Sequence, residues 1–350
     1  MTEGSGRSTA PARIHWALRL ADAFPFAPGW LAVLLTGAGL AIFAALSWAL
    51  GWVDGFRFQG DLFWRTLQFR LELLNAVVLG VLPVAMAVLL RGARRDLREL
   101  GPALALSPAA LEAEQTAITR FPTGTLLAVS LVGSLAGIAI SLDPDNWLGG
   151  RPSLGDPLLL WVLARQILLF ALLAQTAWVD VVVAHRLSRL GERVVKVDLL
   201  DLAPLGAFAR SGLRSVLLWM LGSALAALFL LLPFSSLPAL LSLVLIFAVA
   251  VVALLLPALG VHRRLAEGRR RELARARDAI RVESEALLAE RARSPGRLAD
   301  LLAWEARLDG ASTWPFDAST LVRFALYVTL GLGSWLGGAA VERVLEVILG

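Results

Sequence analysis

The polar residues best placed to do chemistry lie within one apolar stretch, the helix predicted over Leu158–Ala184. Arg165, Gln175 and Asp180 occur there among Leu, Val and Ala residues. A charge in the hydrocarbon core costs at least about 2.5–3.5 kcal/mol on insertion scales, so it should face a partner or a water-filled cavity. The three residues therefore define a candidate intramembrane polar site, which is consistent with an ion or substrate path through a helical bundle.

A structural interpretation of the same residues competes with a transport path. Arg165 and Asp180 are 15 residues apart, or about 22 Å along a helix, so they cannot pair with each other. The Arg165 side chain can extend its charged end towards the membrane surface, and Asp180 can meet headgroups or an arginine. Both interpretations stay open at the level of sequence.

Small residues near the end of the chain form a second motif. Gly333, Ser334, Gly337 and Gly338 provide two small-xxx-small pairs, which allow helices to approach closely in a membrane. The motif predicts either a homo-oligomer contact or docking of the last helix within its own bundle. It is not a dinucleotide fingerprint, because neither the glycine spacing nor a strand-to-helix turn is present.

Other chemistries find no support in the sequence. The chain has no cysteine, which excludes thiol nucleophiles and cysteine-ligated metals. No phosphate loop, nucleophile elbow or zinc-protease helix occurs, so we expect no catalytic residue, metal or cofactor. Segment 261–320 has 12 Arg but also 10 Asp and Glu, and this mixture argues against nucleic-acid binding.

The elements that must position these residues are membrane helices. The chain is 57% hydrophobic and 17% charged, and residues 215–261 contain no Asp, Glu, Lys or Arg in 47 positions. A helix of that length would span about 70 Å, whereas the hydrocarbon core is about 30 Å thick. We therefore expect a transmembrane hairpin of Ser215–Leu232 and Ala239–Gly260, with its reversal at Pro233–Pro238.

Arginine placement predicts how the spans are oriented. Further spans are predicted at Trp30–Leu50, Leu73–Leu90, Thr123–Leu142 and Leu158–Ala184, with a seventh between about 321 and 341. Alternating connections hold 26 Lys and Arg on one side against 5 on the other. By the positive-inside rule, the N-terminus is cytoplasmic and the C-terminus lies outside.

The predicted fold is thus all-α: a polytopic membrane bundle of about seven transmembrane helices with a cytosolic helical hairpin. Its regions are a cytosolic tail with an interfacial helix (1–29), a six-helix transmembrane region (30–260), the cytosolic helical hairpin (261–312) and a C-terminal transmembrane helix (313–350). Leu199, Leu205 and Phe208 make the preceding loop too apolar for a free linker, so it should dock on the bundle.

Two pieces carry a family resemblance: Lys196–Arg210, and the stretch from Trp314 through Tyr327 to Gly338. They resemble a group of multi-pass bacterial inner-membrane proteins with no assigned activity, and together they cover about a tenth of the chain. The resemblance implies a bacterial inner membrane and transfers no functional residues.

The predicted function is non-enzymatic: a sensory, regulatory or scaffolding module in the lipid bilayer that presents residues 261–312 to a cytosolic protein partner. The alternative is a transporter or channel that uses the polar residues of the fourth span.

Overall fold

The computed structural model describes residues 13–51, 67–142, 155–195, 199, 201–228, 236–288, 296–314, 316, 319, 322–330, 333 and 337. Within these ranges the chain is almost entirely helical. The helices are α1 (Trp16–Ala23), α2 (Pro28–Ala49), α4 (Leu67–Leu100), α5 (Pro108–Ala117), α6 (Thr123–Leu142), α7 (Pro157–Val194), α8 (Gly206–Ala227), α9 (Ser236–Leu288) and α10 (Arg297–Asp309), with 3-10 turns η2 (Gly101–Ala103) and η4 (Ala203–Leu205). Residues 322–330 are also helical.

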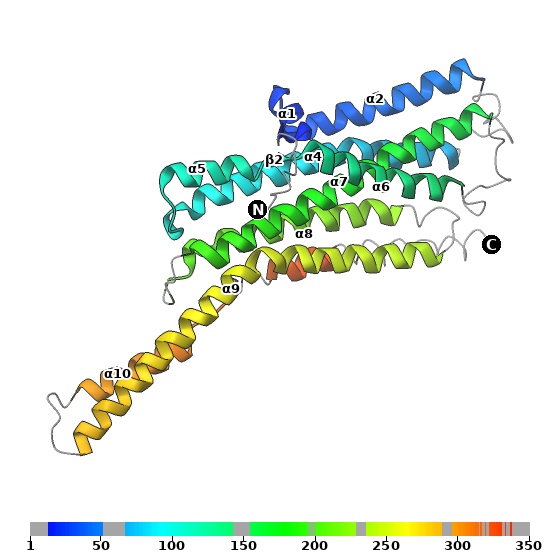
Figure 1. The fold of residues 1–350 in the computed structure, drawn as a ribbon. Helices are drawn as coiled ribbons and strands as arrows, with labels where there is room; N and C mark the ends of the chain where they lie inside the picture. The colour runs from blue at the N-terminus through cyan, green and yellow to red at the C-terminus, as the bar shows by residue number, and fades with distance from the viewer. Residues whose placement is uncertain are drawn as a thin grey trace, which may run out of the picture.

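The helices form one elongated bundle (Figure 1). Neighbouring pairs are α2 with α4, α6 with α7, α7 with α9, and α8 with α9. α9 continues past the end of the bundle, and α10 packs alongside this extension. A two-residue strand β1 (Arg13–Ile14) pairs antiparallel with β2 (Arg120–Phe121) and ties the start of the described chain to the bundle.

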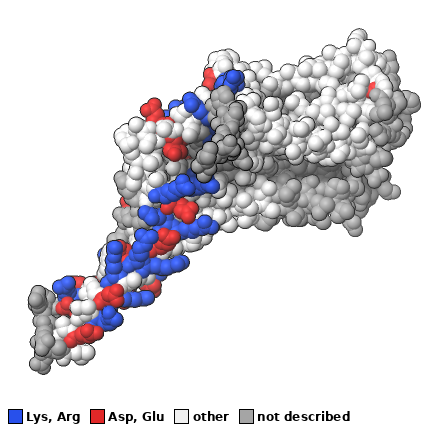
Figure 2. Space-filling view, in the orientation of Figure 1, with Lys and Arg blue, Asp and Glu red and all other residues white. Residues whose placement is uncertain are grey.

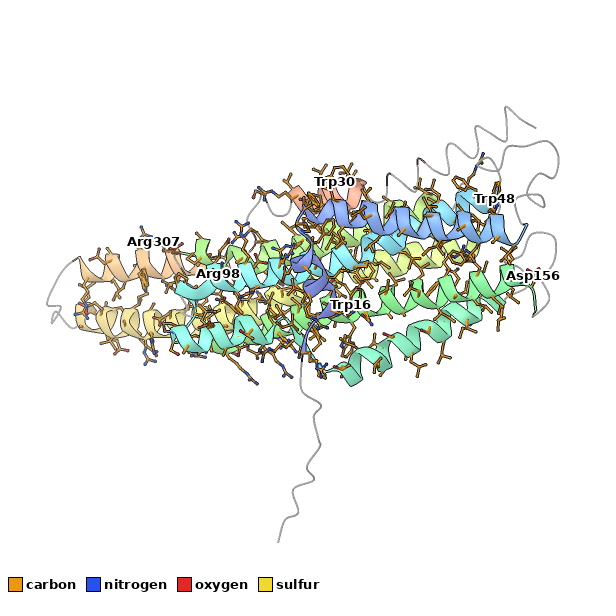
Figure 3. The ribbon with its side chains drawn as sticks, turned by 90° about the horizontal axis from the view of Figure 1, so that it is seen from above. Trp16, Trp30, Trp48, Arg98, Asp156 and Arg307 are labelled. Atoms are coloured by element: carbon orange, nitrogen blue, oxygen red, sulfur yellow. The ribbon has the colours of Figure 1, made fainter. Side chains whose placement is uncertain are left out.

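In the part of the chain that the structure describes, five helices are long and apolar enough to cross a membrane: Pro28–Ala49, Phe69–Ala103, Thr123–Leu142, Pro157–Val194 and Ala248–Leu288. Trp30 and Trp48 lie near the two ends of α2 (Figure 3), about 27 Å apart along its axis. This matches the hydrocarbon thickness, and tryptophans favour its two boundaries. Only 11% of the apolar window of α2 is buried within the chain, so its apolar side chains face outward as lipid contact requires.

The bundle has two halves of different character. The apolar half lies between the levels of Trp30 and Trp48, and the charged half contains α5, the later turns of α4 and α7, and the α9 extension with α10. Figure 2 shows Lys, Arg, Asp and Glu side chains gathered over the charged half, whereas the visible surface of the apolar half is almost free of them.

The main buried core lies largely in the charged half. It joins α4, α7, α8, α9 and α10 through side chains such as Leu97, Leu187, Phe208, Leu265 and Leu308. Leu199 and Leu205 are buried in the same cluster. The prediction that this loop docks on the bundle is therefore confirmed for Leu199, Leu205 and Phe208.

Two helices continue past the predicted ends of their membrane spans. α6 matches its predicted span, Thr123–Leu142, but α7 runs to Val194, past the predicted end of its span at Ala184. α9 is one helix of 53 residues, where a span ending at Gly260 and a separate soluble helix were expected. Arg, Glu, Ala and Leu are all good helix formers, so a change from apolar to charged residues does not end a helix.

The remaining predicted elements are covered only in part. The expected reversal at Pro233–Pro238 falls mostly outside the described residues, as does most of the expected seventh span. Of that span, Phe324 and Tyr327 pack with Phe316 against the cluster formed by α8 and α9.

Candidate functional site

Arg165 lies two turns into α7 and forms an ion pair with Glu72 of α4. Only 8% of the Arg165 side chain and 2% of the Glu72 side chain are exposed. A buried guanidinium requires such a partner, because an isolated charge in this environment is costly. Sequence reasoning missed Glu72 because the predicted second span begins at Leu73, whereas α4 begins at Leu67. The requirement for an acidic partner on a neighbouring span is the signal that could have found it.

The Arg165–Glu72 pair belongs to a polar layer where α2, α4 and α7 meet. The ring of Phe43 on α2 stacks on that of Trp161, one turn before Arg165, with centroids 6.0 Å apart. Within the described residues, four buried polar atoms on α2 and α7 have no hydrogen-bond partner: Ser47 Oγ, Trp161 Nε1, Arg165 Nε and Gln166 Oε1. Unpaired buried polar groups of this kind are places where water or a small polar molecule can bind.

Gln175 links α7 to two other helices. Its Oε1 accepts a hydrogen bond of 2.8 Å from Trp16 Nε1 on α1, and its Nε2 donates one of 2.6 Å to Ser130 Oγ on α6. Both functional groups of the amide are thus used between helices. Gln175 holds α1 against the bundle at the level of Trp30 and Trp16 (Figure 3).

Asp180 links α7 to α8. Its Oδ1 accepts a hydrogen bond of 2.6 Å from Ser215 Oγ, and its Oδ2 accepts one of 2.8 Å from Trp219 Nε1. Asp180 is 3% exposed. Both groups that donate hydrogen bonds to its carboxylate, a hydroxyl and an indole N–H, are neutral.

The three predicted site residues do not meet. Gln175 lies about 15 Å from Arg165 along α7, and Asp180 a further 7.5 Å on. Each contacts a different neighbour: Arg165 meets α4, Gln175 meets α1 and α6, and Asp180 meets α8. The arrangement provides three separate contacts between helices.

An ion-pair network joins α4 to α8 beyond Asp180. Arg214 pairs with the buried Asp96 at 2.9 Å, and Arg210 pairs with Glu99 at 2.5 Å. A Cβ atom added to Gly92 would lie only 2.1 Å from the Arg214 guanidinium. Glycine at this position therefore makes room for the Arg214 side chain between the two helices.

His15 is a further buried titratable group, at the N-terminus of α1. Its Nδ1 accepts a hydrogen bond from Ala17 N–H at 3.3 Å and so caps the helix. Its ring meets Phe121 of β2 edge-on at 5.5 Å. Burial, with a smaller contribution from the charge of Arg19, lowers the pKa of His15 to about 4, so the ring is neutral at pH 7.

The base of the α9 extension is tied to the chain that follows α10. The ring of His262 stacks on that of Trp314 at 4.1 Å, and its Nδ1 lies 3.1 Å from Thr313 O. Arg269 donates hydrogen bonds to the carbonyls of Leu308 and Asp309, at the C-terminus of α10. These contacts satisfy carbonyls that a helix end leaves unpaired.

The small-residue motif is only partly covered. A Cβ added to Gly333 or Gly337 would meet nothing within 4 Å, while Ser334 and Gly338 lie outside the described residues. A separate shallow groove of about 560 Å³ runs along α5 beside Arg186. The Arg186 guanidinium donates to the carbonyls of Ala117 and Arg120, which uses much of its hydrogen-bonding capacity.

Comparison with protein-family models, curated proteins and solved structures yields no match for this chain. The class that the fold defines is an all-helical bundle with several helices suited to crossing a membrane. Its function has to be argued from the residues themselves.

Proposed function

We propose that this protein is a bacterial inner-membrane module that presents a cytosolic helical hairpin, residues 261–312, to a protein partner. In this proposal its role is sensory, regulatory or scaffolding, without a reaction of its own. Seven transmembrane helices and a cytoplasmic N-terminus complete the topology, as the positive-inside rule favours.

The observation that carries the proposal is the continuity of α9. Ala250 and Leu254 of this helix pack in the bundle against α8, and Leu265 and Leu273 of the same helix belong to the core of the charged half. α10 is held on the extension by the ion pairs Arg277–Glu305 and Arg297–Glu283. The extension and the bundle therefore form one continuous framework.

The extension offers a surface suited to a protein partner. Apolar side chains that are exposed there include Val282, Leu288 and Trp304, and they lie among Arg, Glu and Asp residues of both signs. Apolar anchors within a polar rim are typical of protein interfaces.

Orientation can be tested first, because the chain contains no cysteine and each introduced cysteine is unique. We expect Gly155→Cys and Arg271→Cys to react with a membrane-impermeant maleimide on opposite sides of the membrane, with only Gly155→Cys labelled in intact cells. Labelling of both positions from the same side would contradict the topology.

Partner binding can be tested by shortening the hairpin. Residues 278–304 are replaced by a short Gly-Ser turn, which keeps the Arg277–Glu305 pair at the new end, and the same Gly-Ser insertion after Gly155 serves as the control. We expect in-cell crosslinking followed by purification to recover a partner with the wild type and the control and to lose it with the shortened chain. An unchanged set of crosslinked proteins would refute the proposal.

A transporter or channel is the second candidate, and the unpaired polar atoms around Arg165 favour it. Arg165→Leu would then abolish movement of protons or small ions into dye-loaded proteoliposomes. If wild-type protein shows no movement above protein-free vesicles, this second candidate fails for these ions.

A further inference from the structure

Asp180 has an unusual environment for a buried carboxylate. Its direct donors are the neutral Ser215 hydroxyl and the Trp219 indole N–H. Buried carboxylates are usually paired with a cation, but the nearest arginine on α8, Arg214, forms its ion pair with Asp96. Two buried carboxylates thus lie near one guanidinium, which leaves one negative charge without a cation of its own.

The hydrogen bonds around Asp180 can be satisfied in both protonation states. In the charged state, Ser215 and Trp219 each donate to one carboxylate oxygen. The Ser215 hydroxyl also lies 3.4 Å from Ser211 O, and a hydroxyl rotates to suit its partners. When a proton binds to Oδ1 of Asp180, that O–H can donate to Ser215 Oγ, and Ser215 can turn its hydrogen towards Ser211 O. Trp219 continues to donate to Oδ2.

Few of the helices around Asp180 carry charged residues close to it. α6 and the stretch of α9 from Ser236 to Val261 have no ionisable residue. On α8 the charge within electrostatic range is that of Arg214, which pairs with Asp96 of α4. His185 and Arg186 follow on α7 itself, more than one turn further along. A proton on Asp180 would therefore change the charge balance of the Asp96–Arg214 pair more than that of any other pair.

The partner of Asp180 also contacts the helix that leaves the bundle. Trp219 packs against the cluster that contains Met220 of α8 and Ala250 and Leu254 of α9. The aromatic residues Phe316, Phe324 and Tyr327 pack against the same cluster. A change in the hydrogen bond of Trp219 can therefore alter the packing of α8 against α9.

We propose that Asp180 is a reversible proton-binding site, and that Ser215 and Trp219 transmit its occupancy to the packing of α8 on α9. The binding site stands on its own contacts, whereas the idea that its signal reaches the cytosolic hairpin rests on the proposed function. The proton is the only ligand required, and the O–H bond formed at Asp180 breaks again when the proton leaves.

The test is ¹⁹F NMR of the full chain in nanodiscs, labelled with 5-fluorotryptophan. The Trp219→Phe variant identifies the Trp219 signal. We expect this signal to shift with pH through a single midpoint, because one group titrates beside it.

Two variants decide whether Asp180 is the titrating group. Asp180→Asn should make the Trp219 signal independent of pH, and Ser215→Ala should move the midpoint of the titration because one hydrogen-bonding partner is lost. A Trp219 signal that does not titrate in the wild type, or that titrates unchanged in a folded Asp180→Asn variant, would overturn the proposal. An unchanged midpoint in Ser215→Ala would also overturn it. Loss of the crosslinked partner is measured separately, so failure of the hairpin proposal leaves this result intact.

Discussion

The apolar and charged halves of the bundle are built by the same helices with opposite arrangements of side chains. In the apolar half, α2 and α6 direct Leu, Val and Ile outward, and polar groups such as Arg165 and Glu72 are buried between helices. In the charged half, leucines are buried and arginines are exposed. The difference indicates that two solvents act on one chain, because the apolar half buries its polar side chains and the charged half buries its apolar ones.

The ion pairs of the two halves should differ in strength for the same reason. The Arg165–Glu72 pair is almost fully buried, whereas pairs on α9 such as Arg271–Glu267 are more than half exposed on both sides. Exposed pairs are screened by water and contribute little, while breaking a buried pair leaves a charge without a partner.

The largest effect is therefore expected from Arg165→Leu. Leaving Glu72 without its cation should destabilise the bundle by about 3–5 kcal/mol, measured as unfolding on titration with SDS in mixed micelles. Replacing both members, Arg165→Leu with Glu72→Leu, should recover most of that loss, since a well-packed apolar pair can substitute for a buried ion pair. A double variant as unstable as the single one would contradict this explanation.

Acidification should loosen the attachment of the N-terminal segment. The pKa of His15 is lowered from 6.5 to about 4 in the folded protein. As the pH falls below 6.5, His15 therefore binds a proton when α1 has opened away from the bundle before it does so in the folded protein. Stability is thus unaffected above this value and is lost between pH 6.5 and pH 4, by at most about 3.4 kcal/mol at 1.36 kcal/mol per pKa unit. Hydrogen exchange of α1 as a function of pH measures the effect. His15→Asn should remove this pH dependence, because asparagine can cap the helix without titrating.

Gly260→Ala should separate α7 from α9. A Cβ at Gly260 would lie 1.7 Å from Ser188 O, and Gly260 N–H donates to Ser188 Oγ at 3.1 Å, so the helices must move apart. We expect a cost of about 1–3 kcal/mol, as for other overpacked sites. Gly222→Ala on α8 is the control, since its Cβ meets nothing within 4 Å and alanine favours the helix. Equal stability of the two variants would refute the close contact.

Arg277→Ala should have the smallest effect. Its ion pair with Glu305 at 2.7 Å is 62% exposed on the arginine side, so we expect only a small loss of stability, because exposed pairs contribute little. High salt should reduce the difference from the wild type further. Thermal unfolding of the purified protein at low and high salt provides the measurement, and a loss comparable to that of Arg165→Leu would remove the contrast between the two halves.

Sequence reasoning identified most helices because each has a local signal. Ser107 caps α5 through Ala110 N–H, and α6 has its predicted bounds. The partners of the candidate residues could not be found in this way. Glu72 is 93 residues from Arg165, and Trp219 is 39 residues from Asp180. Such pairs depend on which helices are neighbours, and no periodicity in one helix reveals that.

The uninterrupted course of α9 from Ser236 to Leu288 has a geometric consequence. At 3.6 residues per turn, inserting one residue directly after Gly260 would turn every later side chain of α9 by about 100° around the helix axis. The surface formed with α10 would then point in a new direction while the preceding turns kept theirs. The direction in which this protein offers its outermost helices is therefore set by the number of residues between the bundle and α10, as well as by their identity.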